Sequence, residues 1–541
     1  MSKIENTYDY VIVGAGSAGC VLADRLTRDG RRSVLLIEAG PEDSSPLIRM
    51  PKGFGKLLGD PKHVWWFDAQ PEAGGPNIPA RWHRGKALGG SSSVNGMVYT
   101  RGDPSDYDAW EALGLTGWNW ASMSRAFKAI ENHELGEAET RGEGGPLHIS
   151  PMREPNATGD AFIASGGALG LPIKADLNDL SDQEGVGYAM RTIKNGARFS
   201  AAEAFLKPAR RRKNLRVVTQ TQVDRLIFEG DRVTGVACTG PNGPFEVRCG
   251  REVILSAGAL NSPKILQLSG IGSASTLTAA GVRPRLERAA VGRHMREHRV
   301  LFMQYRLNAP HLSQNREFTG LRLIGNVLKY AALRRGLMAQ AAYEVGAFVR
   351  SRPGLDRPDV QLLMGPFSLT LKDAAAGGPV PEALPGLQCI TLPLRPTSEG
   401  EVRISAATAD APLIIRPNFL STEEDRVSAI AGVRFVRAIA AARPFADLIV
   451  EETVPGPDVQ SDEDILAAYR LFGSPGYHAV GTCRMGVGDD AVTDPRLRVR
   501  GVDGLRIVDC SVMPTIPSGN TNGPVMALAW RAADLILEDA A

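Results

Sequence analysis

The chain has 541 residues, of which 43% are apolar and 23% charged, as in globular proteins that bury a sizeable core. This composition excludes disordered and collagen-like proteins. The 62 Lys and Arg residues are balanced by 60 Asp and Glu, and a net charge of +2 is too small to indicate nucleic acid or an anionic membrane as a partner. We therefore expect a small molecule as the partner.

The cysteines and the hydropathy of the chain bear on its compartment. Six cysteines lie far apart without a C-x-x-C pair, which predicts reduced thiols and no bound metal. The polar N-terminus matches no secretory signal, and no run of 18 apolar residues predicts a transmembrane helix. We expect a cytoplasmic protein, and the sequence is compatible with an oligomer.

The first glycine-rich segment stands between a predicted strand, residues 9–13, and a predicted helix that contains Val21, Leu22 and Leu26. It reads Gly14-Ala15-Gly16-Ser17-Ala18-Gly19. In such a segment the first glycine permits a tight turn, the second lets the backbone approach a pyrophosphate, and the third lets the helix pack closely on the strand. The phosphate would then lie at the helix N-terminus.

A second predicted strand, residues 33–37, ends at Glu38, which Ala39 follows. An acid about 20 residues after the glycines typically binds ribose hydroxyls and disfavours a 2′-phosphate. A glycine-rich turn alone could merely join a strand to a helix. Strand, helix, strand and terminal acid in this order predict dinucleotide binding, but the spacing does not distinguish NAD from FAD.

Two further segments are rich in glycine, serine and other small residues. Residues 85–102 read GKALGGSSSVNGMVYTRG, and residues 251–272 contain a predicted strand followed by AGALNSPKILQLSGIG. Taken alone, the first of these could be a turn-rich loop in the core.

Five motifs in order resemble one family. The N-terminal VGAGSAG with IEAG, the two segments above, YHAVGTCRMG at residues 477–486 and the C-terminal LRIVDCSVMPTIPSGNTNGPVMALAWRAADLI are similar to those of the glucose-methanol-choline family of FAD oxidoreductases. Their order and spacing hold from about residue 8 to residue 537, nearly the whole chain. The resemblance implies that the cofactor is FAD.

By this resemblance the first motif binds the ADP part of FAD, and the second runs beside the pyrophosphate and the flavin. The implied cofactor-binding residues are Gly14, Gly16, Ser17, Ala18, Gly19, Glu38, Ala39, Arg84, Gly89, Gly90, Ser93, Asn95, Gly96, Val223, Ala257, Gly258, Asp509, Asn520 and Thr521. The backbone of Val223 would face adenine, and Asp509 would lie near the ribityl chain and the pyrophosphate. Some members attach FAD covalently to a histidine at the position of Val94, so we expect non-covalent FAD here.

His478 is the candidate catalytic base. A lone histidine is more often an ordinary core or surface residue, but the resemblance implies that this one faces the flavin and removes the hydroxyl proton of an alcohol. The second active-site position aligns with Asn520, with Asn522 as the alternative. A neutral amide can donate a hydrogen bond to the alcohol oxygen but is a poor base, which favours His478 for that role. A turn or helix cap is the structural alternative for Asn520.

The implied reaction is oxidation of a primary or secondary alcohol to an aldehyde or ketone, with the proton going to His478 and the hydride to flavin N5. Flavin-dependent hydroxynitrile lyases belong to the same family, so a non-redox lyase is the alternative. An FAD-binding protein without catalysis is disfavoured because His478 and Asn520 occur together. The sequence leaves open which alcohol is used, and whether O2 or a quinone or artificial acceptor takes the electrons.

Two departures from the family pattern affect the site. Ala479 stands where many members have proline after the histidine, and residues 292–298 read GRHMREH where the family usually has G-E-N-L-x-D-H. His294 and His298 are four residues apart, as helical metal ligands can be. No third ligand is evident, and we interpret both as structural.

The motifs predict an α/β fold, α+β overall, in which a Rossmann-like FAD-binding domain is interleaved with a substrate domain built on an antiparallel sheet with helices. The FAD-binding domain takes residues 1–150, 195–300 and 466–541, and the substrate-binding domain takes 151–194 and 301–465. Residues 321–335 predict an amphipathic helix, which we expect at the substrate entrance rather than at a membrane surface. The Gly- and Pro-rich residues 374–386 are expected to cover the pocket.

Overall fold

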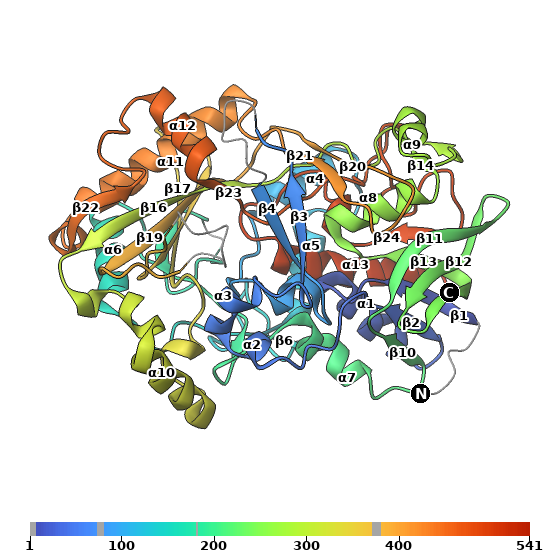
Figure 1. Ribbon diagram of the computed structural model, residues 1–541, viewed down its shortest axis with the longest axis horizontal. Helices are drawn as coiled ribbons and strands as arrows, with labels where there is room; N and C mark the ends of the chain where they lie inside the picture. The colour runs from blue at the N-terminus through green and yellow to red at the C-terminus, as the bar shows by residue number, and fades with distance from the viewer. Residues whose placement is uncertain (1–6, 73–79, 180–181, 371–379, 541) are drawn as a thin grey trace.

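The computed structural model describes residues 7–72, 80–179, 182–370 and 380–540. Two seven-stranded sheets organise these residues and lie toward opposite ends of the molecule (Figure 1). The mixture of helices and sheets confirms the predicted fold class. Residues 374–379 of the segment expected to cover the pocket lie outside the described residues.

The first sheet has the strand order β10-β2-β1-β13-β12-β11, with β24 beside β13. Its strands are β1 (Thr7–Val13), β2 (Val34–Ile37), β10 (Leu215–Val218), β11 (Gln222–Glu229), β12 (Arg232–Gly240), β13 (Gly243–Leu255) and β24 (Leu505–Ile507). Strands β10, β2, β1, β13 and β24 pair in parallel, whereas β11, β12 and the first half of β13 form an antiparallel meander. A turn with Gln220 at positive φ separates β10 from β11, the strand that holds Val223.

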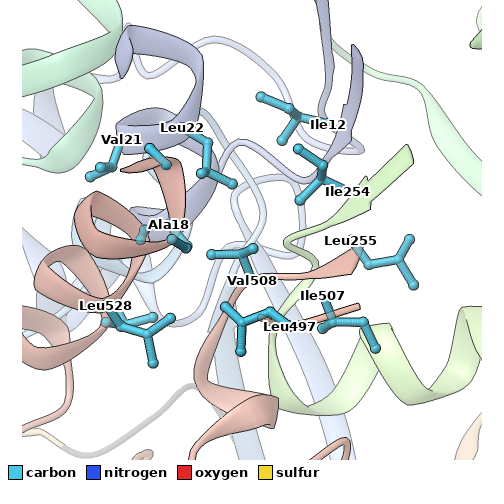
Figure 2. Packing of buried hydrophobic residues seen from close by; sticks show 14 of the residues in the cluster. Ile12, Ala18, Val21, Leu22, Ile254, Leu255, Leu497, Ile507, Val508 and Leu528 are labelled. Atoms are coloured by element: carbon cyan, nitrogen blue, oxygen red, sulfur yellow. The ribbon is translucent and has the colours of Figure 1, made fainter. Parts of the chain in front are cut away.

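Helices from the two ends of the chain cover this parallel sheet. Its central strands are largely aliphatic, and residues 10–13, 34–37 and 253–255 are buried, as is usual where both faces are covered. Side chains of α1 (Ser17–Thr27), α13 (Asn522–Asp539) and the strands converge in one core, in which Leu22, Leu528 and Ile254 are labelled in Figure 2. The last helix of the chain is thus part of the first core.

The second sheet is antiparallel and has the order β22-β16-β19-β18-β17-β7, with β23 beside β16. Its strands are β7 (Gly185–Tyr188), β16 (Arg299–Leu307), β17 (Val345–Val349), β18 (Val360–Gly365), β19 (Gly386–Pro393), β22 (Ile449–Val454) and β23 (Gly473–Pro475). Alternate residues such as Leu301 and Leu362 form a core with helices on one face, and their neighbours, such as Val300 and Leu363, form a separate cluster on the other.

The remaining elements cover or join the sheets. The longer helices are α4 (Pro104–Ala112), α5 (Trp120–Ile130), α6 (Ala157–Ala168), α8 (Gly258–Leu268), α9 (Ala274–Ala279), α10 (Gly320–Leu333), α11 (Glu423–Ala441) and α12 (Asp462–Phe472). Short helices are α2 (Pro46–Arg49), α3 (Phe54–Leu57) and α7 (Lys207–Ala209). Two-stranded pairs are β3 (Val64–Ala69) with β4 (Ala80–Gly85), β5 (Glu131–His133) with β6 (Leu147–Ile149), β8 (Ile193–Lys194) with β9 (Ala197–Arg198), β14 (Ile271–Gly272) with β15 (Leu286–Glu287), and β20 (Glu401–Ile404) with β21 (Leu413–Arg416).

Two segments lie differently from the predicted domain boundaries. The boundary at residue 466 cuts through α12, whose Ile465 and Tyr469 belong to the core of the second sheet, and β23 pairs with β16. The β20–β21 pair, placed by sequence in the substrate domain, packs against α8 through Val402 and Leu260. Within the described ranges, no helix is both long and apolar enough to span a bilayer.

Candidate active site

The carboxyl ends of the five parallel strands are aligned. Val13 pairs with Ile37 on one side and with Leu255 on the other, Val218 pairs with Ile37, and Ile507 pairs with Leu255. The cofactor residues predicted from sequence directly follow four of these ends: the Gly14 turn, Glu38 with Ala39, Ala257 with Gly258, and Asp509. Ligands of open parallel sheets bind at this edge.

The first glycine turn leaves no room for a side chain at Gly14 or Gly19. Gly14 has φ +99°, and a Cβ there would lie 2.5 Å from the carbonyl oxygen of Ser256. Gly16 is the N-cap of α1 and supplies no side-chain cap, so the first N–H groups of the helix can bind an anion. Gly90 of the second glycine segment crosses this turn, since a Cβ on it would lie 2.6 Å from Gly16 Cα.

Glu38 is buried at the end of β2. Its carboxylate accepts hydrogen bonds from the N–H groups of Ala15 at 2.8 Å and Gly40 at 2.9 Å, and burial raises its pKa to about 7. A carboxylate has about four acceptor positions, so two remain for ribose hydroxyls. Thr221 donates its N–H to the carbonyl of Glu38 at 2.9 Å, and the strand that holds Val223 begins at the next residue.

Asp509 joins the end of β24 to the start of α8. Its carboxylate accepts from the N–H of Gly258 at 2.8 Å, the hydroxyl of Ser262 at 2.6 Å and the N–H of Ser511 at 2.8 Å. The nearby hydroxyl of Ser256 is buried without a protein partner, as expected for a polar atom that a bound molecule satisfies.

The N-termini of α1 and α13 meet. The hydroxyl of Ser17 donates to Asn522 Oδ1 at 2.8 Å, and Thr521, the N-cap of α13, makes no side-chain cap. Two helix N-termini without side-chain caps beside glycine turns fit the diphosphate of a dinucleotide. The other predicted flavin neighbours lie on β4, on the 3-10 turn Gly90–Ser93 and just after it: Arg84, Gly89, Gly90, Ser93, Asn95 and Gly96.

The imidazole of His478 is part of a buried hydrogen-bond chain. His298 Nε2 lies 2.8 Å from the carbonyl oxygen of Leu394, and His298 Nδ1 lies 2.9 Å from His478 Nδ1. The carbonyl only accepts, so Nε2 of His298 carries the hydrogen. Burial lowers the pKa of His298 to about 4, so this ring is neutral and its Nδ1 accepts. His478 therefore donates from Nδ1, which leaves the lone pair on its Nε2.

Asn520 lies at this lone pair. Its Nδ2 is 3.1 Å from His478 Nε2, and its Oδ1 accepts from Gln361 of the second sheet at 3.4 Å. The Gln361 contact orients the amide so that its N–H groups face the histidine. Asn522, the alternative considered from sequence, instead contacts Ser17 at the start of α1.

Glu297 holds together the two segments that carry His298 and His478. Its Oε1 accepts the N–H of His478 at 2.7 Å and the N–H of His298 at 2.9 Å, and Arg84 lies 3.4 Å from its Oε2. Burial raises the pKa of Glu297 to about 7, and Arg84 opposes this shift. Gly476 is in close contact with the pair, since a Cβ there would lie 2.9 Å from His298 Cβ and 3.2 Å from His478 Nδ1.

The interpretation of His298 as merely structural missed its contact with His478. The segment that holds His294 and His298 is not helical, so spacing by four does not bring the two side chains together. His294 pairs with Glu399 at 2.7 Å instead. The adjacent Glu297 and His298 at the end of the GRHMREH segment were the sequence feature that could have indicated a role in the site. Nothing in the sequence indicated that it meets a segment about 180 residues later. Among the described residues no group of three or more His, Cys, Asp or Glu is arranged to hold a metal ion.

Burial also determines the charge of His478. Desolvation lowers the pKa of its imidazole well below the ordinary value, and His298 and Arg84 lower it further. The ring is therefore neutral near pH 7 and able to accept a proton.

Comparison with known proteins identifies the family of the chain. The family model described as GMC oxidoreductase matches residues 8–300 and 396–529. Human mitochondrial choline dehydrogenase is 38% identical, over 99% of this chain and 90% of its own, and the alcohol dehydrogenase (acceptor) of Pseudomonas putida is 38% identical over 98% and 96%. The crystal structure of pyridoxine 4-oxidase from Mesorbium loti superposes with a TM-score of 0.88 at 33% identity, over 98% of this chain and 99% of that one. These relatives are dehydrogenases and oxidases and do not favour the lyase alternative. The chain belongs to the GMC oxidoreductase family and is an FAD-dependent enzyme that oxidises alcohols.

Proposed function

We propose that His478 Nε2 is the base that accepts the hydroxyl proton of the alcohol. The observation that carries this proposal is the chain from the Leu394 carbonyl through His298 to His478 Nδ1, because it puts the lone pair of the His478 imidazole at Nε2, on the side of Asn520. The lowered pKa of His478 keeps that lone pair available near neutral pH.

Asn520 orients the same hydroxyl. Its amide nitrogen Nδ2 and His478 Nε2 are 3.1 Å apart, so one alcohol oxygen can lie within hydrogen-bond reach of both. The neutral amide stabilises developing alkoxide charge without competing for the proton. Bound FAD supplies the acceptor for the hydride that leaves the carbinol carbon. We infer that FAD is held without a covalent bond, because Val94 offers no nucleophile.

The variant His478→Ala tests the base. It should retain flavin, because no cofactor contact predicted here depends on the imidazole, and flavin reduction by alcohol without oxygen should slow by about 10³-fold. His294→Asn is the matched control, since His294 pairs with Glu399 outside the chain of hydrogen bonds and Asn tolerates its φ of 58°. Reduction of His478→Ala at the normal rate would remove His478 from the reaction.

We further propose that the substrate is a neutral alcohol with an apolar substituent. The face of the second sheet that carries Gln361, and through it contacts Asn520, is apolar or amide-bearing. Its residues on β16, β17, β18 and β19 include Val300, Phe302, Gln304, Phe348, Gln361, Leu363, Gln388, Ile390 and Leu392. Two carboxylates on the segments that lead into this sheet already have partners: Glu297 pairs with Arg84, and Glu344 lies 3.6 Å from Lys52. No unpaired anion among these residues would attract a quaternary ammonium.

An alcohol panel tests this selectivity. Benzylic and aliphatic alcohols should bleach the flavin under anaerobic conditions at concentrations at least about 10-fold below those needed for choline, a margin of about 1.4 kcal/mol in binding. A preference for choline would contradict the proposal. Release of cyanide from a cyanohydrin without bleaching would instead favour a lyase.

We propose a quinone-like or artificial acceptor rather than O2 as the preferred oxidant. Support comes from the alcohol dehydrogenase (acceptor) of Pseudomonas putida, which is 38% identical over nearly the full length. The oxygen-dependent choline dehydrogenase of Vibrio vulnificus, 40% identical, makes O2 the alternative that the experiment distinguishes. The substrate-reduced enzyme should reoxidise faster with a soluble quinone than in air-saturated buffer. Faster reoxidation in air would make the enzyme an oxidase.

A further inference from the structure

Helix α10 exposes large aliphatic side chains to an unusual degree. Leu321 is 86% exposed, Ile324 55%, Leu328 64% and Leu333 61%. Four of the 15 exposed large hydrophobic side chains in the described residues thus lie on one 14-residue helix, while the others are scattered along the chain. In Figure 1 the helix projects from the lower edge of the end that holds the second sheet. Single exposed leucines need no explanation, but a cluster of them marks an interaction site.

The exposed residues form one face of α10. Leu321, Ile324 and Leu328 are spaced by three and four residues, so they share a face, and Ala331 continues it. The opposite face does the packing expected of an ordinary surface helix. There Tyr330, with Leu323 and Val327 beside it, packs against Met50 and Met338. A surface helix should be polar on the side away from its core, and this one is not.

The charged residues of the helix itself and of the two residues after it are all positive. Residues 320–335 contain Arg322, Lys329, Arg334 and Arg335, all exposed, and no Asp or Glu. The nearest acid in sequence, Glu317, is bound to Arg322 at 3.0 Å. The balanced net charge of the whole chain therefore conceals a local cationic patch. A second copy of the same face would bring Lys329, Arg334 and Arg335 near like charges, which disfavours pairing of α10 with itself.

We propose that α10 docks the enzyme on the surface of an anionic phospholipid bilayer. The helix would lie in the plane of the interface, with Leu321, Ile324 and Leu328 at the boundary between headgroups and acyl chains. Arg322 and Lys329 flank this face, and their long side chains can reach the headgroup phosphates. This interaction lies beyond alcohol oxidation and does not depend on His478 or Asn520. It gives the helix the membrane-surface role that its amphipathic sequence also allowed.

Co-sedimentation of the full-length, FAD-loaded protein with vesicles tests the proposal. The protein should bind vesicles of phosphatidylcholine mixed with phosphatidylglycerol, bind phosphatidylcholine alone more weakly, and lose binding as salt increases. The triple variant Leu321→Asn, Ile324→Asn, Leu328→Asn should bind at least about 10-fold more weakly. The variant Arg322→Gln, Lys329→Gln should lose the preference for phosphatidylglycerol.

Matched controls separate this face from exposed hydrophobicity in general. Leu113→Asn and Leu471→Asn change leucines that are 55% and 59% exposed elsewhere, and vesicle binding should not change. All variants should keep their flavin absorbance and their turnover with a soluble acceptor. If the triple variant loses flavin, the Arg322 and Lys329 variant decides the question alone.

Three results would overturn the proposal. The wild-type protein could fail to bind either vesicle, or the controls could weaken binding as much as the α10 variants do. The wild type could also be a dimer that the triple variant dissociates without any vesicle binding, in which case the face is a contact between subunits.

Discussion

The two sheets contribute to the site in different ways. The first sheet contributes backbone groups, since its parallel strands end in register and are followed by glycine turns and helix N-termini. The second offers side chains, since alternate residues of its antiparallel strands face the reacting groups. A site made of backbone needs glycine at particular positions and leaves short motifs in the sequence. A surface made of side chains appears in the sequence only as an alternation of residues along each strand, and most antiparallel sheets share that pattern.

The two residues proposed to act on the alcohol, His478 and Asn520, belong to neither sheet. His478 follows β23 and Asn520 precedes α13, so each is carried on a loop between the two regions. The comparison therefore predicts two classes of variant. Changes on the first side should lose flavin, and changes on the second side should keep flavin and lose alcohol oxidation.

The largest effect is expected at Gly14. In Gly14→Ala the new Cβ would lie 2.5 Å from the Ser256 carbonyl at a φ of +99°, so the turn must move. We expect purified protein with almost no flavin and a free energy of unfolding lower by about 2–4 kcal/mol. Flavin absorbance per protein and denaturant titration measure the two. Gly30→Ala is the matched control, because Gly30 also has positive φ but nothing lies within 4 Å of its Cβ position, and it should keep its flavin.

Variants of Asn520 and Asn522 distinguish most clearly between loss of alcohol oxidation and loss of flavin. Asn520→Ala removes the amide beside His478 Nε2 and should slow flavin reduction by about 10²-fold with flavin retained. Asn522→Ala removes the partner of Ser17 and should weaken flavin binding while the remaining loaded enzyme reacts almost normally. Stopped-flow reduction and flavin content distinguish the variants. The opposite pattern would show that the roles of the two asparagines are reversed.

A smaller effect is expected at His298, which acts through His478. His298→Leu removes the acceptor for His478 Nδ1–H and should slow flavin reduction by about 10-fold, because the imidazole is no longer held in the reactive tautomer. His298→Asn, whose amide oxygen can accept that hydrogen, should recover part of the rate. Equal rates in the two variants would indicate that the site needs only the volume of His298.

The pH dependence should be the mildest effect. The base must be neutral, so kcat/KM falls as the pH drops through the pKa of His478, which burial holds well below 6.5. The acid limb should therefore lie below pH 6.5. Glu297 has a pKa of about 7 and could add a limb there, which Glu297→Gln would remove. A limb near pH 7 that persists in Glu297→Gln would contradict a neutral His478.

The sequence by itself determined the family, the cofactor and the fold class of this protein. Glycine turns and strand ends are local constraints, because a φ of +99° or a backbone approach to phosphate is a property of a few consecutive residues. Tertiary structure alone decided that His298 and Glu297 meet His478, that α12 and β23 join the second sheet, and that the outer face of α10 has no partner among the described residues. Each of these depends on packing between segments far apart in the chain, and periodicity within a segment shows which faces are apolar but not what each face meets.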